Sequence, residues 1–209
     1  VLICNTDEDL VMERQYLSLY RSGMIDGIII SPSDNSANLN IFETMNSEGF
    51  PIVFADRYID SLNNSFVTTD SYYGAFMLTH KLIEKGHRKI FFLSHTKSPN
   101  TSVQIDRYNG YLDAISTYSL EGRRMSIPNA FYIATQMLHN LLTGDDIPTA
   151  IVMVTSWDIN PLLRTCCDLG ISIPKDIEVA AFDRFSIPYS SATDMRVARS
   201  LKEPLSIDE

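Results

Sequence analysis

The stretch from Ala150 to Arg184 constrains the fold of this 209-residue chain more than any other segment. An apolar run, AIVMV, is followed by a helical pattern, a turn that contains Gly170, and a second apolar run, IEVAAF. Short apolar runs bounded by turn residues are typical of buried strands, and two of them separated by a helix are typical of a parallel sheet. We therefore expect a strand, a helix and a strand here, with polar side chains at the carboxyl end of each strand.

The same alternation runs along the whole chain. We expect strands near residues 1–4, 27–30, 52–55, 66–68, 89–93, 151–154 and 177–182, and helices near 10–22, 39–48, 72–85, 103–118, 130–142 and 158–169. Asp9 is the expected N-cap of the first helix, and Gly23 is its expected stop. This rhythm predicts an α/β fold of doubly wound parallel sheets.

Polar residues follow five of the expected strands. They are Ser31 and Ser33, Asp56 and Arg57, Ser94 and His95, Thr155 and Ser156, and Asp183. Ligands of open parallel sheets bind outside the carboxyl ends of the strands. Carboxylates accept hydrogen bonds from hydroxyls and arginine donates them, so this set suits a polyhydroxylated, largely uncharged ligand. The alternative, that loops after strands are polar because water reaches them, stays open for any single position.

The formal net charge of −9 disfavours binding to a phosphate backbone. Any contact with DNA therefore has to come from a segment outside this chain. Cys4, Cys166 and Cys167 show no disulfide spacing, which fits a cytoplasmic, reducing compartment, and we expect Cys166 and Cys167 to be buried, unreactive thiols. No apolar stretch approaches ~18 residues, so no membrane contact is predicted.

Signatures of catalysis are missing from the sequence. The four histidines lack metal-ligand spacing, and no G-x-S-x-G elbow, phosphate-binding Walker loop or G-x-G-x-x-G motif occurs. We predict no catalytic residue, no metal and no cofactor. An enzyme on a doubly wound scaffold remains the weakest of the alternatives, because fold does not fix function.

Several segments, in order, resemble the effector-sensing domains of LacI/GalR transcription regulators. They are DGIIISPS (26–33), PIVFADR (51–57), VTTDSYYGAFMLTHKLIEKGHRKIFFL (67–93), RYNGYLDAI (107–115) and the block 150–183. The resemblance implies two Rossmann-like subdomains joined by crossover strands, as in periplasmic binding proteins. It places an N-terminal subdomain at residues 1–95, a C-terminal subdomain at 96–183 and a return segment at 184–209.

The resemblance also implies effector contacts. Arg107, which opens RYNGY, matches the arginine that binds the effector, and Asp183 and Asp56 match aspartates on the two sides of the site. The alternative for Arg107 and Asp183 is a structural ion pair. Thr155 stands where the family has a ligand-binding asparagine, and Trp157 could stack on a sugar face or pack between helix and sheet. Ser31 and Ser33 are weaker candidates.

The resemblance further implies a homodimeric regulator whose small, sugar-like effector modulates operator DNA binding through an N-terminal helix-turn-helix domain not present in this chain. The alternative is a periplasmic sugar-binding protein of a transporter. By comparison with the family, we expect a strand and a helix to precede Val1. The interval between Ser119 and Ala130 also looks too short for the strand that the family has there.

Overall fold

The structure is a computed structural model that describes residues 1–96, 100–155 and 159–182. The chain divides into two compact units, one of residues 1–71 and 98–106 and the other of residues 72–97 and 107 onward. This boundary differs from the expected break at residue 95, because the strand before it pairs with strands of the second unit. The predicted α/β class with parallel sheets is confirmed in both units.

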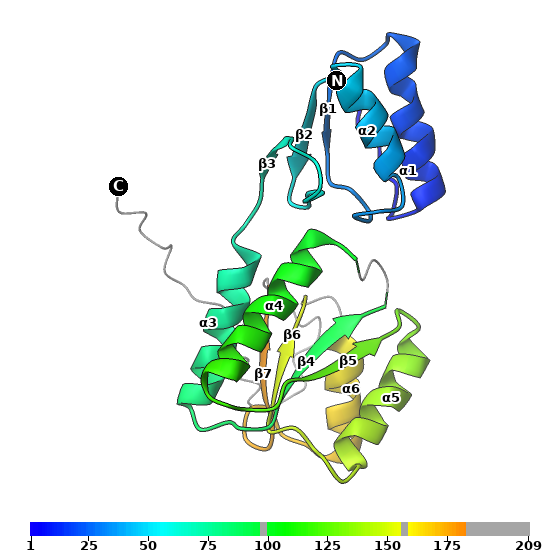
Figure 1. Ribbon diagram of the computed structural model, residues 1–209. Helices are drawn as coiled ribbons and strands as arrows, with labels where there is room; N and C mark the ends of the chain where they lie inside the picture. Colours follow the sequence, from blue (N-terminus) through cyan, green and yellow to red (C-terminus); the bar gives the residue numbers. More distant parts are fainter. Residues whose placement is uncertain (97–99, 156–158, 183–209) are drawn as a thin grey trace. The chain divides into compact units, whose positions relative to one another are not determined.

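In the first unit, three described strands form a parallel sheet in the order β1-β2-β3 (Figure 1). They are β1 (Ile28–Ile30), β2 (Ile52–Ala55) and β3 (Ser65–Val67), and the helical elements are α1 (Leu10–Leu17), η1 (Ser18–Ser22) and α2 (Leu39–Ser47). The Asp9 carboxylate accepts hydrogen bonds from the amides of Val11 and Met12, which confirms the predicted N-cap. Gly23 ends η1 with a φ of 68°, in the left-handed region that favours glycine.

Helices cover one face of this sheet. Phe42 and Met45 of α2 are fully buried against the strands, together with Phe54 of β2. The opposite face carries Ile29, which is 79% exposed. Residues 1–4, predicted as a strand, belong to no strand: Val1, Leu2 and Ile3 are exposed, and the described residues offer them no strand to pair with.

The second unit is built around a four-stranded parallel sheet with the order β5-β4-β6-β7 among its described strands. The strands are β4 (Ile90–His95), β5 (Arg123–Ile127), β6 (Ala150–Met153) and β7 (Glu178–Ala181), and the helices are α3 (Ser71–Glu84), α4 (Ser102–Thr117), α5 (Phe131–Thr143) and α6 (Ile159–Leu169). Helices α3 and α4 lie on one face and α5 and α6 on the other (Figure 1). The first five residues of α4 belong to the first unit.

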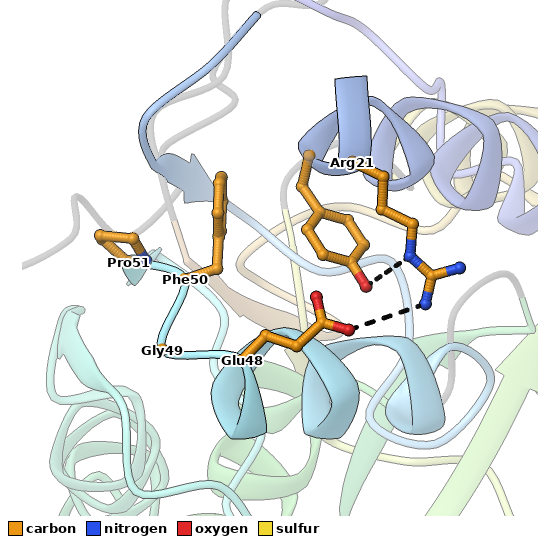
Figure 2. Close-up of a pocket in the computed structure, with 6 residues that line it drawn as sticks. Arg21, Glu48, Gly49, Phe50 and Pro51 are labelled. Carbon is orange, nitrogen blue, oxygen red and sulfur yellow. Dashed lines mark hydrogen bonds and ion pairs between the residues drawn. The ribbon is translucent and has the colours of Figure 1, made fainter. Parts of the chain in front are cut away.

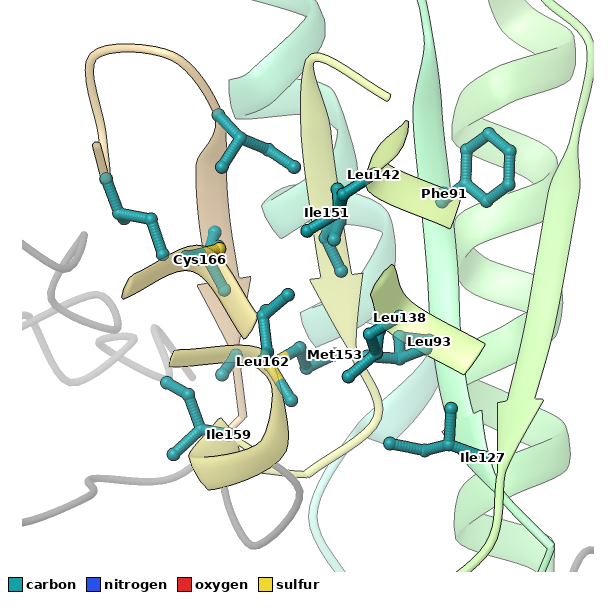
Figure 3. Close-up of a cluster of buried hydrophobic side chains, with 14 of the residues drawn as sticks. Phe91, Leu93, Ile127, Leu138, Leu142, Ile151, Met153, Ile159, Leu162 and Cys166 are labelled. Atoms are coloured by element: carbon teal, nitrogen blue, oxygen red, sulfur yellow. The ribbon is translucent and has the colours of Figure 1, made fainter. Parts of the chain in front are cut away.

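Alternate residues of the inner strands β4 and β6 point to opposite faces of the sheet and belong to two hydrophobic cores. Phe91, Leu93, Ile151 and Met153 pack against α5 and α6, as Figure 3 shows. Their neighbours in sequence, including Phe92 and Val152, pack with the buried Tyr111 on the α3 and α4 side. Both faces of β4 and β6 are therefore apolar, which explains why their sequences are continuous apolar runs.

Strand β5 corrects the expectation that residues 119–130 leave no room for a strand. Its five residues, RRMSI, pair in parallel with Phe91–His95. Tyr111 anchors the start of β5, because its hydroxyl accepts a hydrogen bond from the Arg123 amide at 2.8 Å and donates to the carbonyl of Ile90 at 2.7 Å. An edge strand is paired on one side only and tolerates charged residues, so no apolar run marked this strand in the sequence.

The two adjacent cysteines of α6 also differ from expectation. Cys166 is buried in the core, as predicted, but Cys167 is exposed. Successive residues of a helix point about 100° apart, so a helix that packs one face on a sheet cannot bury both.

Candidate functional site

Arg107 is held at the carboxyl edge of the second unit's sheet by two contacts of different kinds. Its Nη1 donates a hydrogen bond to the carbonyl of Val154, at the end of β6, over 2.5 Å. Its Cζ lies 3.9 Å from the centroid of the Phe182 ring, which follows β7. The side chain is only 9% exposed. The guanidinium is thus fixed in orientation at the edge where ligands of such sheets bind.

The glycine of the RYNGY segment explains how α4 comes close enough to place Arg107. A Cβ on Gly110 would lie 2.1 Å from the carbonyl oxygen of Tyr72 and 3.0 Å from the amide nitrogen of Phe76, both in α3. Only glycine allows this backbone approach between α3 and α4. The motif is therefore partly a packing motif, and its arginine lies one helical turn before the contact.

Thr155 and His95 follow the ends of two neighbouring strands. Strand β4 pairs with β6 up to Leu93 and Met153, and the Val154 amide continues the ladder to the Leu93 carbonyl at 2.8 Å. His95 is the last residue of β4, and Thr155 follows the end of β6 by two residues. Both side chains are partly exposed.

Asp56 lies in the first unit, directly after β2, and its side chain is exposed. Its φ is 65°, a left-handed conformation that is uncommon for a residue with a side chain. Two contacts hold it there: its amide donates to the Val67 carbonyl at 2.8 Å, and the Thr68 hydroxyl donates to its carbonyl. Backbone strain of this kind at a strand end is often found at functional sites.

Ser31 and Ser33 follow β1 and differ in environment. Ser31 is exposed, whereas Ser33 is 2% exposed and its amide donates to the Glu13 carboxylate at 2.7 Å. Glu13, itself 2% exposed, also accepts a hydrogen bond from the Asn38 side chain at 2.8 Å. A buried carboxylate therefore fixes the loop that carries both serines.

Two sequence-predicted residues, Asp183 and Trp157, lie outside the described residues. Within the described ranges, no group of three acidic, histidine or cysteine side chains could hold a metal ion. None of the helices that the structure describes is long and apolar enough to cross a membrane.

A hollow of about 500 Å³ lies elsewhere on the first unit (Figure 2). It is lined by Tyr20, Arg21, Glu48, Gly49, Phe50 and Pro51. Arg21 donates to the Tyr20 hydroxyl at 2.8 Å and lies 4.0 Å from the Glu48 carboxylate, and both charged side chains are largely exposed. None of the sequence-predicted site residues lines this hollow, and a solvated ion pair of this kind contributes little binding energy.

Sequence reasoning missed two residues that position the candidate site. Phe182 ends the apolar run of β7 and was assigned to the strand, yet its ring lies against Arg107. Glu13 is a charged residue of helix α1, where such a side chain is normally solvated, yet it is buried. These roles can be recognised only from the contacts that the two residues make in the fold. The Glu13 contact, for example, is with Ser33, which lies 20 residues away in the chain.

The chain was compared with known proteins. The profile of the periplasmic binding protein-like domain family matches residues 79–199. A ribose operon repressor of Halalkalibacterium halodurans is 27% identical over 88% of this chain and 53% of its own length. The HTH-type transcriptional repressor PurR of Glaesserella parasuis serovar 5 is 26% identical over 88% of this chain and 54% of its own length. The solved structure of a LacI family transcriptional regulator from Silicibacter pomeroyi superposes on this chain with a TM-score of 0.73 at 19% sequence identity. The superposition covers 88% of this chain and 68% of the regulator's chain, and it shows that the two share a fold.

The family profile covers more than half of the chain, so the chain belongs to the periplasmic binding protein-like domain family. The relatives aligned with 88% of the chain are transcriptional repressors. The chain spans about half the length of the curated relatives it matches.

Proposed function

We propose that this chain is the effector-sensing and dimerisation domain of a transcriptional regulator that binds a small sugar-like molecule. The effector contacts are Arg107, Thr155, Asp183 and Trp157 of the second unit and Asp56, Ser31 and Ser33 of the first. Effector binding shifts the equilibrium between two conformations of a homodimer and so changes operator affinity at a helix-turn-helix domain outside this chain. The protein acts in the cytoplasm.

The placement of Arg107 supports this proposal most directly. Arg107 is buried at the carboxyl edge of a parallel sheet, where ligands of such sheets bind, and it contacts a backbone carbonyl and an aromatic ring there. The planar group presents several donors in a fixed geometry, which suits ring and hydroxyl oxygens of a sugar.

The composition of the site favours a polyhydroxylated ligand over an anion. Asp56 is an exposed carboxylate, and Ser31 offers an exposed hydroxyl. Carboxylates accept hydrogen bonds from ligand hydroxyls but repel phosphate or carboxylate groups. One relative is a repressor of a ribose operon, so D-ribose is the first compound to test.

Thermal unfolding with added ligands tests the binding proposal. The panel holds D-ribose, other pentoses and hexoses, disaccharides, sugar phosphates and nucleobases. We expect D-ribose, or another pentose or hexose, to raise the unfolding midpoint saturably by a few degrees. Arg107→Lys and Asp56→Asn should weaken the response at least about tenfold, because each removes a directed hydrogen bond to ligand. Arg164→Lys, on an exposed arginine paired with Asp168, is the matched control.

The regulatory part of the proposal needs the full-length protein. Its binding to operator DNA should be sequence-selective and salt-sensitive, and the stabilising compound should change that affinity by about 5- to 150-fold. A full-length protein without sequence-selective DNA binding would contradict the regulator assignment, even if the sugar response were present.

A further inference from the structure

His95 has a buried ring nitrogen without a partner. Its Nδ1 is inaccessible to solvent and has no hydrogen-bond partner among the residues that the structure describes, although the side chain as a whole is partly exposed. A buried polar atom without a partner costs about 1–3 kcal/mol. Such atoms are rare in native proteins, and each one calls for an explanation.

The other histidines show what a purely structural histidine looks like in this chain. His87 uses both ring nitrogens, with the Thr149 hydroxyl and the Glu178 carboxylate each at 3.1 Å. His80 contacts the Tyr118 hydroxyl at 2.8 Å and Glu84 at 3.3 Å. His139 is exposed and can be hydrated. Among these four, only His95 combines a buried nitrogen with the lack of a partner.

The position of His95 is equally specific. It is the last residue of β4, paired with the fully buried Ile127 of β5 on one side. On the other side, β6 pairs with β4 up to Met153, and Thr155, one of the residues assigned to the effector, follows two residues later. Leu93 and Met153, two residues earlier on the same face, are buried in the core, so His95 and Thr155 stand where that face opens at the carboxyl edge.

We infer that His95 is a further effector-contact residue, whose Nδ1 hydrogen-bonds a hydroxyl group of the ligand beside Thr155. A neutral imidazole nitrogen can donate or accept, and so can a hydroxyl, so this pairing works in either tautomer. The inference rests on the proposed function and adds a contact that determines specificity: ligands without a hydroxyl at that position leave the nitrogen unsatisfied and bind more weakly.

Three variants test the inference. His95→Leu removes both nitrogens, His95→Asn keeps a hydrogen-bonding atom close to the Nδ1 position, and His139→Leu makes the same change at an exposed site. In the absence of any added compound, we expect the unfolding midpoint of His95→Leu to lie no lower than that of His139→Leu and up to about 4 °C higher, because a buried unsatisfied atom is removed. A midpoint below that of the His139→Leu control would show that His95 serves stability and would overturn the inference.

The second measurement is the response to D-ribose and to every panel compound that stabilises the wild type. We expect His95→Leu to weaken the apparent affinity at least about tenfold and His95→Asn to stay within about threefold of wild type. Unchanged affinity in His95→Leu would overturn the inference while leaving the proposed function intact. If no compound stabilises the wild type, the proposed function fails, and the inference that rests on it fails with it.

Discussion

Arg107 and Phe182 form a cation–π pair, with the guanidinium carbon 3.9 Å from the ring centroid. The two residues come from elements that are far apart in the sequence, α4 and the end of β7. The pair fixes the plane of the guanidinium, while the Val154 carbonyl fixes its direction. The guanidinium is therefore preorganised, which lowers the entropy that ligand binding has to overcome.

Removing the ring should weaken both ligand binding and stability. A cation–π contact contributes about 0.5–2 kcal/mol. We expect Phe182→Leu to lower the free energy of unfolding by no more than about 2 kcal/mol, measured by urea denaturation. The affinity for the stabilising sugar, measured by calorimetry, should fall about three- to thirtyfold because Arg107 loses its fixed plane. Phe182→Tyr keeps the ring face and should retain affinity; a loss equal to that of Phe182→Leu would rule out the cation–π role.

Gly110→Ala should be one of the most damaging single-methyl changes in the chain. The added carbon would lie 2.1 Å from the Tyr72 carbonyl oxygen, so α3 and α4 would have to separate. Overpacking of this kind costs about 1–3 kcal/mol or more. The free energy of unfolding is the measurement, and Asn109→Ala, at the exposed neighbouring position of α4, should change it by less than about 0.5 kcal/mol. Equal stability of the two variants would contradict the close approach.

Glu178 should make stability depend on pH in the acid range. Burial raises the pKa of this carboxyl, but hydrogen bonds from Lys85 and His87, with their charges, outweigh it and hold the pKa below the usual 4.5. A lowered folded-state pKa gives stability that is present above the unfolded value and is lost as pH falls through the folded value. Urea midpoints between pH 3 and pH 7 should therefore drop below about pH 4.5 in wild type and less steeply in Glu178→Gln. The exposed Glu121→Gln should follow the wild-type curve.

Thiol labelling should distinguish the two adjacent cysteines. Burial raises the pKa of the Cys166 thiol to about 11, so this thiol stays protonated and inaccessible at pH 8. Cys4 and Cys167 are exposed. Mass spectrometry after brief alkylation should find two modified cysteines in the folded protein and three after denaturation. Rapid modification of Cys166 in the folded protein would contradict the packing of α6 on the sheet.

The order of strands and helices follows largely from local patterns. Continuous apolar runs such as the one in β6 predict buried parallel strands, and the Asp9 cap predicts the start of α1. Strand β5 was not predicted because three of its five side chains, Arg123, Arg124 and Ser126, are polar, and its place depends on pairing with β4 and on the Tyr111 hydroxyl. Residues 1–4 have a strand-like composition, but a strand needs a neighbour, and composition does not supply one.

The candidate site shows a similar division. The sequence predicts which residues follow strands, because that depends on local alternation and on the resemblance to a known family. It does not predict the hydrogen bond from the Ser33 amide to the buried Glu13 carboxylate or the contact of Phe182 with Arg107. Nor does it predict that the His95 Nδ1 lacks a hydrogen-bond partner among the described residues. Each of these depends on contacts between residues distant in the chain.

The approach of Gly110 to Tyr72 also bears on how a sensor of this kind acquires a new ligand. The helix pair that positions Arg107 is set by backbone atoms, and position 110 accepts no side chain without moving α3. Positions 95 and 155 differ from it in carrying partly exposed side chains near the ends of their strands. Inherited changes of specificity are therefore expected at the strand ends, on a helix frame that remains unaltered, and a library meant to redirect the sensor should vary those two positions and keep Gly110.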